Sequence, residues 1–256
     1  MASSIPWTSL KALSFDIYGT LIDWENGIAQ AARATALGPY LPQSHKQLML
    51  DIEKHDTTVQ RENPTLPQTQ IIAEGLRRYA KDLGVVEKGQ LTEADVERAC
   101  KDYGGKIGDY PAFEDSVEAM KMLRKRYKLI PLSNVDNQSF SQTLNGPLLG
   151  VKFDAVYTAQ DIGSYKPDVR NFEYLLEHVK SDFGVEKEQL CHVAQSLFHD
   201  HGPAQKVALQ SVWVDRGGEM GGNPEGAQEK FGFKLRVETL RDLAEIVEEA
   251  FKKEGK

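Results

Sequence analysis

The sequence contains few cysteines and no apolar stretch long enough to cross a membrane. Two of its 256 residues are cysteines, Cys100 and Cys191, and their wide separation provides neither a disulfide framework nor the spacing of a zinc site. No apolar run approaches the roughly 18 residues that a membrane span requires, and the first residues lack the basic and apolar regions of a secretory signal. These absences predict a cytoplasmic protein that has no contact with a membrane.

The sequence also lacks an excess of positive charge. It has 31 Lys and Arg residues against 38 Asp and Glu residues, which gives a net charge of −7. A nucleic-acid-binding protein usually carries a basic face, so this balance argues against a nucleic-acid partner. The apolar share of 40% is ordinary for a globular protein, and the length suffices for one large domain with a smaller second unit.

Short apolar segments that predict β-strands alternate with helical patterns in the second half of the chain. We expect strands at residues 11–15, 128–132, 153–158, 190–195 and 211–215. We expect helices at residues 116–127, 169–184 and 238–253. Because this alternation is typical of a parallel sheet covered on both faces, the sequence predicts an α/β fold with a Rossmann-like core.

The segment between the first and second strands shows helical patterns and almost no strand signal. Residues 91–103 form one such pattern, with Thr92 as the expected N-cap. Three glycines and a proline in residues 103–113 suggest a hinge that returns the chain to the core. We therefore expect an all-helical cap subdomain inserted into the α/β core. The expected boundaries are 22–109 for the cap, and 1–21 with 110–256 for the core.

Polar and charged side chains follow the expected strands at the points where those strands end. Asp16 follows the first strand, and Ser133 and Asn134 follow the second. Lys166 comes soon after the third strand, and Asp200 lies in the loop after the fourth. Open parallel sheets bind ligands at the carboxyl ends of their strands. The sequence therefore predicts two carboxylates, a hydroxyl group and an ammonium group at one edge of the sheet.

These residues belong to four short motifs that follow one another along the chain. The motifs are DIYGTLID, LSN, YKPD and the loop QSLFHDHG. Together they resemble the motifs of the haloacid dehalogenase superfamily, and the similarity spans nearly the whole chain. Phosphatases of that superfamily usually carry a second Asp two residues after the nucleophile, a place that Tyr18 occupies here. The D-x-Y-G-T form resembles the type II L-2-haloacid dehalogenases.

The resemblance implies a hydrolase that acts through a covalent ester. Asp16 would displace halide from a small 2-halocarboxylate, and water would then hydrolyse the resulting ester. Lys166 would balance the charge of Asp16, and Asp200 would orient Lys166 or act as a base. The resemblance implies a small anionic substrate, no cofactor and a homodimer. The expected substrate-binding residues are Tyr18, Thr20, Ser133, Asn134, Gln195 and Ser196.

Three positions depart from the dehalogenase pattern. Met49 stands near the place of the family's cap arginine, and Phe172 stands where the family has a tyrosine. The family's Ser-Ser-Asn loop is replaced by residues 194–196, with one extra residue before Asp200. Each change removes a polar contact, which costs about 1–3 kcal/mol when the partner stays buried. Four residues are alternatives for the missing arginine: Lys46, Lys54, His55 and Arg61.

Two other functions stay open at this point. A magnesium-dependent phosphatase would use Asp16, the carbonyl group of Tyr18 and Asp200 as ligands, because magnesium prefers oxygen. The side chain of Tyr18 counts against this alternative. A binding protein that kept the fold but lost efficient catalysis is favoured by Met49 and Phe172. The retained carboxylates and lysine count against it.

Overall fold

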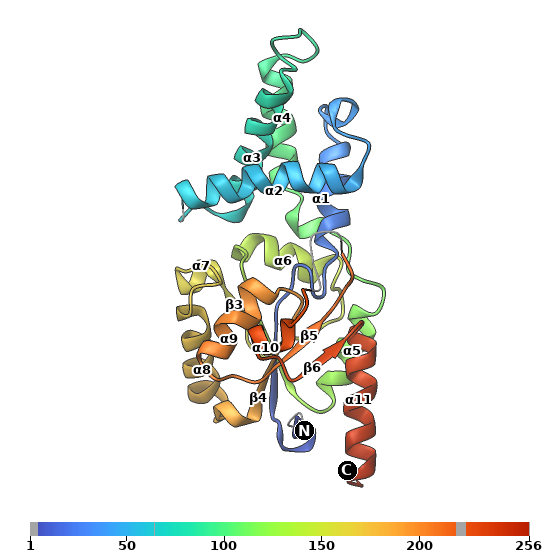
Figure 1. Cartoon of the computed structure of the whole chain (residues 1–256), viewed down its shortest axis with the longest axis vertical. Coiled ribbons are helices and arrows are strands. Elements are labelled where there is room, and N and C mark those ends of the chain that lie inside the picture. The colour runs from blue at the N-terminus through green and yellow to red at the C-terminus, as the bar shows by residue number, and fades with distance from the viewer. Residues whose placement is uncertain (1–4, 64, 219–223, 256) are drawn as a thin grey trace. The chain divides into compact units, whose positions relative to one another are not determined.

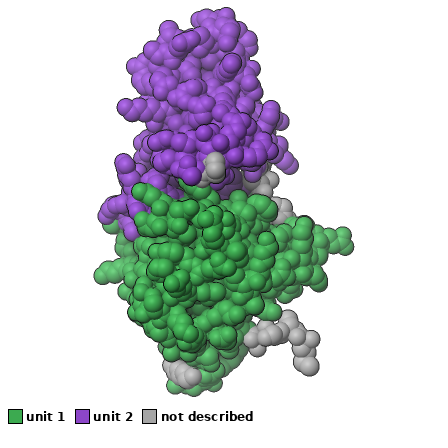
Figure 2. Space-filling model, turned by 90° about the vertical axis from the view of Figure 1, so that its left-hand side faces the viewer, with its two compact units in different colours: residues 1–23, 112–134, 148–256 green, residues 24–111, 135–147 purple. Residues whose placement is uncertain are grey.

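The computed structural model describes residues 5–63, 65–218 and 224–255, and it divides the chain into two compact units. Unit 1 comprises residues 1–23, 112–134 and 148–256. Unit 2 comprises residues 24–111 and 135–147 (Figure 2). The segment 135–147, which the sequence analysis assigned to the α/β core, thus groups with the helical unit.

Unit 1 contains a six-stranded sheet in which all strand pairs are parallel (Figure 1). The strand order is β3-β2-β1-β4-β5-β6, so the direction of winding reverses at the central strand β1. The strands are β1 (Ala12–Phe15), β2 (Lys128–Ser133), β3 (Tyr157–Thr158), β4 (Leu190–Ala194), β5 (Ser211–Val214) and β6 (Leu235–Val237). This topology confirms the predicted Rossmann-like parallel sheet.

Helices cover both faces of this sheet, which explains why its central strands read as continuous apolar runs. All residues of β1 and β4 are buried. Figure 1 shows α8 and α9 on one side of the sheet, and α5 and α11 on the other. Phe172, Leu175 and Val179 of α8 pack in one core cluster with Ile130 and Leu132 of β2. The helices of unit 1 are α5 (Ser116–Arg124), α7 (Ala159–Ile162), α8 (Arg170–Phe183), α9 (Gly202–Lys206), α10 (Ala227–Phe231) and α11 (Leu240–Lys253).

The secondary structure that is described in unit 2 is helical. Its helices are α1 (Trp24–Arg33), α2 (His45–Glu62), α3 (Gln68–Leu83), α4 (Glu93–Gly104) and α6 (Asn137–Asn145). Thr92 caps α4 as predicted, because its hydroxyl group accepts a hydrogen bond from the Asp95 backbone at 3.1 Å. The Asp95 carboxylate accepts one from the Thr92 backbone in return, which completes a capping box.

Two strands differ from the sequence expectation. The strand predicted at 153–158 is confined to Tyr157–Thr158. The Asp154 backbone donates to the Leu129 carbonyl group at 2.9 Å, but it is the Asp154 carboxylate that accepts from the Leu129 backbone, at 3.0 Å, so the regular strand pairing is limited to the last two residues. Strand β6 was not predicted, because it is short, lies at the sheet edge and carries the exposed Arg236 at its centre. Such a segment lacks the continuous apolar run of a central strand.

A buried ion pair ties the end of β5 to the start of α5. The Arg216 guanidinium group donates to the Asp115 carboxylate at 2.8 Å, and burial lowers the pKa of Arg216. Arg216 also donates to the backbone carbonyl group of Thr20 at 2.8 Å. The other Asp115 oxygen accepts from the backbone of Leu240 at 2.6 Å, at the start of α11. One ion pair therefore joins four separate segments of unit 1.

None of the helices in the described part of the chain combines the length and the apolar character that a membrane span requires. Cys191 is buried in β4, and burial raises the pKa of its thiol. Part of the glycine-rich segment 217–226 lies outside the described residues.

We expect Asp115→Ala to lower the free energy of unfolding by about 3 kcal/mol, because it leaves the buried Arg216 charge without its partner. Glu118→Ala is the matched control on the same helix. It removes an exposed pair with Lys121 and should cost less than about 1 kcal/mol. Urea unfolding of both variants tests this, and equal losses would contradict the role assigned to the buried pair.

Candidate active site

The ammonium group of Lys166 lies between two buried carboxylates at the carboxyl edge of the sheet. Lys166 Nζ is 2.8 Å from Asp16 Oδ1 and 2.6 Å from Asp200 Oδ1. It also donates to the backbone carbonyl group of Leu132 at 2.8 Å. Asp16 follows β1 and Asp200 follows β4, so the neighbouring strands bring these residues together as the sequence predicted.

This environment shifts the pKa values of the two carboxylates in opposite directions. Burial raises the pKa of Asp16, and the attraction of Lys166 only partly opposes this effect. Burial acts on Asp200 in the same direction, but Lys166 and a hydrogen bond from His192 outweigh it and lower the pKa of Asp200. The two carboxylates raise the pKa of Lys166 against the effect of its burial. Asp16 is therefore the more basic carboxylate, and Asp200 the one held as an anion.

A tight turn after β1 fixes the Asp16 carboxylate. Gly19 adopts a φ of +99°, in the region that favours glycine, and donates from its backbone to the Ile22 carbonyl group at 2.7 Å. The Thr20 hydroxyl group donates to Asp16 Oδ2 at 2.9 Å and accepts from the Gln195 backbone at 2.9 Å. Thr20 thus links the first motif to the fourth. Tyr18 lies in the same turn and is half-buried.

Ser133 and Asn134, at the end of β2, have different surroundings. The side-chain amide of Asn134 makes two hydrogen bonds with the Lys166 backbone. Its Nδ2 donates to the Lys166 carbonyl group at 2.9 Å, and its Oδ1 accepts from the Lys166 N–H group at 2.7 Å. Asn134 thus orients the lysine segment, which includes a cis bond between Lys166 and Pro167. Ser133 Oγ and Asp200 Oδ2 are buried and have no hydrogen-bond partner within the described structure. The hydrogen-bonding capacity of these two buried atoms is therefore unused within the described residues.

The fourth motif forms a single π turn at Leu197–His201. The Gly202 backbone donates to the carbonyl group five residues earlier, at Leu197, and the Ser196 hydroxyl group accepts from the His199 backbone at 3.0 Å. A π turn contains one residue more than an α turn, so it accommodates the extra residue before Asp200. Ser196 acts here as an N-cap, and the Gln195 carbonyl group accepts from Trp213 Nε1 at 2.9 Å.

His192 and Ser14 belong to this site, although the sequence analysis did not identify them. His192 Nε2 lies 2.9 Å from Asp200 Oδ1, and its Nδ1 lies 2.8 Å from Ser14 Oγ. Both residues are fully buried. They lie in the middle of apolar strands, so the sequence pattern indicates core positions there and no functional role. A polar residue within such a run was the only signal available.

Two of the departures from the family pattern, Phe172 and Met49, lie at buried positions. Phe172 is fully buried and packs edge-on against the His192 ring, with the ring centroids 5.1 Å apart. Met49 is fully buried within unit 2. Among the alternatives for the cap arginine, His55 stacks on Tyr79, and Lys46, Lys54 and Arg61 are exposed.

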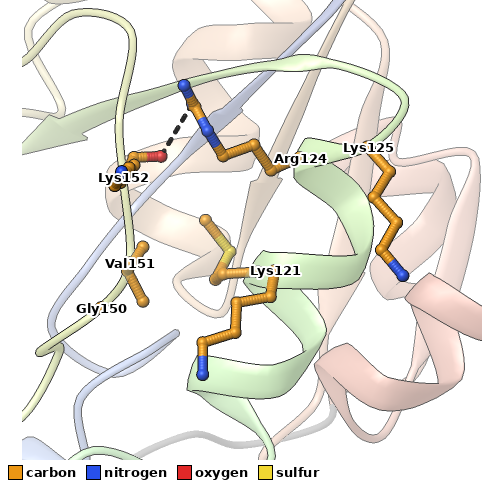
Figure 3. Close-up of a pocket in the computed structure, with 7 residues that line it drawn as sticks. Lys121, Arg124, Lys125, Gly150, Val151 and Lys152 are labelled. Atoms are coloured by element: carbon orange, nitrogen blue, oxygen red, sulfur yellow. Dashed lines mark hydrogen bonds between the residues drawn. The ribbon is translucent and has the colours of Figure 1, made fainter.

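Figure 3 shows a basic pocket of unit 1 that contains none of the predicted site residues. Lys121, Arg124 and Lys125 extend from α5, and Arg124 donates to the backbone carbonyl group of Lys152 at 3.0 Å. These residues precede β2, so the pocket lies at the amino end of a strand whose carboxyl end carries Ser133. It is separate from the cluster around Lys166.

A sequence model of the haloacid dehalogenase-like hydrolases matches residues 10–194, which is more than half of the chain. The chain belongs to this family. The predicted superfamily and the predicted hydrolase class are therefore confirmed.

Two curated relatives are similar over nearly their full length. The chain is 25% identical to (S)-2-haloacid dehalogenase 4A of Burkholderia cepacia over 92% of this chain and 94% of the relative. It is 24% identical to (S)-2-haloacid dehalogenase of Pseudomonas sp. strain YL over 94% and 96%. A crystal structure of a dehalogenase with an intermediate complex superimposes with a TM-score of 0.72 at 21% identity, over 93% of this chain and 97% of that one. The structural similarity shows the shared fold.

His201 gives the site region a pH-dependent stability. Burial lowers the pKa of His201 to about 4, so the folded protein resists a proton that the unfolded chain accepts below about pH 6.5. Stability is therefore lost as the pH falls from about 6.5 towards 4. We expect this group to remove about 2 kcal/mol between pH 7 and pH 5, measured by urea unfolding. His201→Gln should lose correspondingly less over the same interval, and an unchanged pH dependence in that variant would contradict the assignment.

Proposed function

We propose that this hydrolase displaces halide from a small 2-halocarboxylate through an ester on Asp16, with a preference for the L enantiomer. The observation that carries the proposal is the single ammonium group of Lys166 between two buried carboxylates of unequal basicity. The names of both curated relatives support the substrate class and its stereochemistry.

In the first step, an oxygen of Asp16 attacks the carbon that bears the halogen. A carbon–oxygen bond forms, the carbon–halogen bond breaks, and halide leaves with the bonding electron pair. Thr20 and Lys166 each bond one Asp16 oxygen, so the carboxylate is held in one orientation before it reacts. Such orientation lowers the entropic part of the barrier. The raised basicity of Asp16 makes it the better nucleophile of the two carboxylates.

In the second step, water attacks the carboxyl carbon of the Asp16 ester. Asp200 Oδ2 accepts a proton from this water, because it is the Asp200 oxygen without a protein partner. The bond between the carboxyl carbon and the alkyl oxygen breaks, and the departing alkoxide takes the proton to give the 2-hydroxy acid. Asp16 is regenerated, with the water oxygen in its carboxyl group, and the second proton goes to solvent.

The free Ser133 hydroxyl group is the proposed donor to the substrate carboxylate, since it is buried and has no partner. Tyr18 and Gln195 are proposed to contact the substrate from the neighbouring loops. Thr20, Asn134 and Ser196 are proposed to act indirectly, because their side chains bond Asp16, the Lys166 backbone and the His199 backbone.

The donor set does not suit a magnesium ion. Lys166 donates to Oδ1 of both Asp16 and Asp200, and the Thr20 hydroxyl group donates to Oδ2 of Asp16. A cation at these carboxylates would lie beside a buried ammonium group that already compensates their charge, and of the four carboxylate oxygens only Asp200 Oδ2 lacks a hydrogen-bond partner within the described residues. Within the described residues, no group of three His, Cys, Asp or Glu side chains is arranged to hold a metal. We propose a reaction without a metal cofactor, in a cytoplasmic homodimer.

We expect Asp16→Asn to abolish halide release from L-2-chloropropionate while the protein stays folded, because the amide is a far weaker nucleophile. Circular dichroism checks the fold, and mass spectrometry excludes deamidation back to Asp. Asp182→Asn, an exposed carboxylate on α8, is the control that should retain full activity. An active Asp16→Asn protein that still contains Asn would contradict the mechanism.

We expect a chelator to leave halide release unchanged and magnesium to confer no phosphatase activity on p-nitrophenyl phosphate. Both results follow from the ammonium group that bridges the carboxylates. Loss of activity on chelation, restored by magnesium, would instead support the phosphatase alternative. An absence of turnover with both substrate classes would support the binding-protein alternative.

A further inference from the structure

We propose that His192 is a positioning residue for the hydrolytic step, held by Ser14 and acting through Asp200. This inference rests on the proposed dehalogenase function and extends it to residues outside the four motifs. Ser14 lies on β1 and His192 on β4, and these two residues are direct partners in the parallel register. The sheet itself therefore sets the contact between them.

The hydrogen-bond donors and acceptors of this network fit one arrangement. An ionised carboxylate only accepts hydrogen bonds, so His192 Nε2 carries the proton that it donates to Asp200 Oδ1 at 2.9 Å. In the neutral ring, Nδ1 then accepts from the Ser14 hydroxyl group at 2.8 Å. Phe172 packs edge-on against the ring at 5.1 Å between centroids, which restrains its plane. The imidazole thus has one orientation.

The consequence of this arrangement is the asymmetry of Asp200. Oδ1 accepts from both Lys166 and His192, whereas Oδ2 has no partner. Without His192, the carboxylate would be held by Lys166 alone and could rotate about that bond. With His192, Oδ2 is the oxygen left free to accept the proton of the attacking water. His192 therefore determines which oxygen acts as the base.

Three variants separate positioning from a general structural role. His192→Leu removes the donor to Asp200, and His192→Gln keeps an N–H group that can replace Nε2. Cys191→Ala is the matched control, since it alters the preceding buried residue of β4, whose side chain points to the opposite face of the sheet. Each variant is tested as the full chain with L-2-chloropropionate, by rapid-quench halide release and mass spectrometry.

We expect His192→Leu to release the first equivalent of halide at nearly the wild-type rate and then to turn over about 10- to 100-fold more slowly. The Asp16 ester should accumulate, and KM should fall together with kcat, so that kcat/KM changes little. His192→Gln should recover most of the turnover, and Cys191→Ala should show no accumulated ester. The inference would be overturned by an equal fall of the first and later turnovers without ester, or by a Gln variant no better than Leu.

A crystal structure of His192→Leu provides a readout that is independent of the substrate. We expect the Asp200 carboxylate to rotate away from the position seen here, and an unmoved carboxylate would overturn the inference. If the Leu variant does not fold, the structure and rates of Ser14→Ala and His192→Gln replace it. If the wild-type protein releases no halide, the proposed function fails, and the Asp200 position alone decides the role of His192.

Discussion

The contact of the Lys166 ammonium group with two buried carboxylates is the interaction on which the rest of the site depends. Isolated charges are expensive to bury, so Asp16 and Asp200 can lie at the sheet edge only because this cation lies between them. Lys166 favours the anionic form of both carboxylates, but burial outweighs this effect at Asp16, whereas Lys166 and His192 together outweigh burial at Asp200. A divalent ion at these carboxylates would have to bind beside this buried ammonium group, which already compensates their charge.

The fold supplies this geometry through rigid elements. Asp16 directly follows the central strand β1, and the neighbouring strands β2 and β4 lead to Ser133 and Asp200. Asn134 holds the Lys166 backbone, and Arg216 holds the carbonyl group of the turn residue Thr20. The π turn after β4 accommodates an extra residue and still places Asp200 Oδ1 within hydrogen-bond distance of Lys166 Nζ. Each reacting group is thus fixed by a neighbour that does not itself touch the substrate in the proposed mechanism.

Much of this could be predicted from the sequence, because strand ends and ordered motifs are local signals. The apolar runs before Asp16 and Ser133 predicted β1 and β2, and Thr92 predicted the start of α4. The assignment of 135–147 to the helical unit could not be predicted, because it depends on contacts between distant segments. His192 was missed for the same reason, since its polar partners lie 178 and 8 residues away in the sequence.

A single turnover in water that carries a heavy oxygen isotope tests the central claim, the nucleophilic role of Asp16, most directly. With protein in excess over L-2-chloropropionate, the account predicts that the label enters the carboxyl group of Asp16. The 2-hydroxy acid of that turnover should be unlabelled, because its new oxygen comes from Asp16. Label found in the product and absent from Asp16 would mean that water attacks the substrate directly, and it would contradict the account.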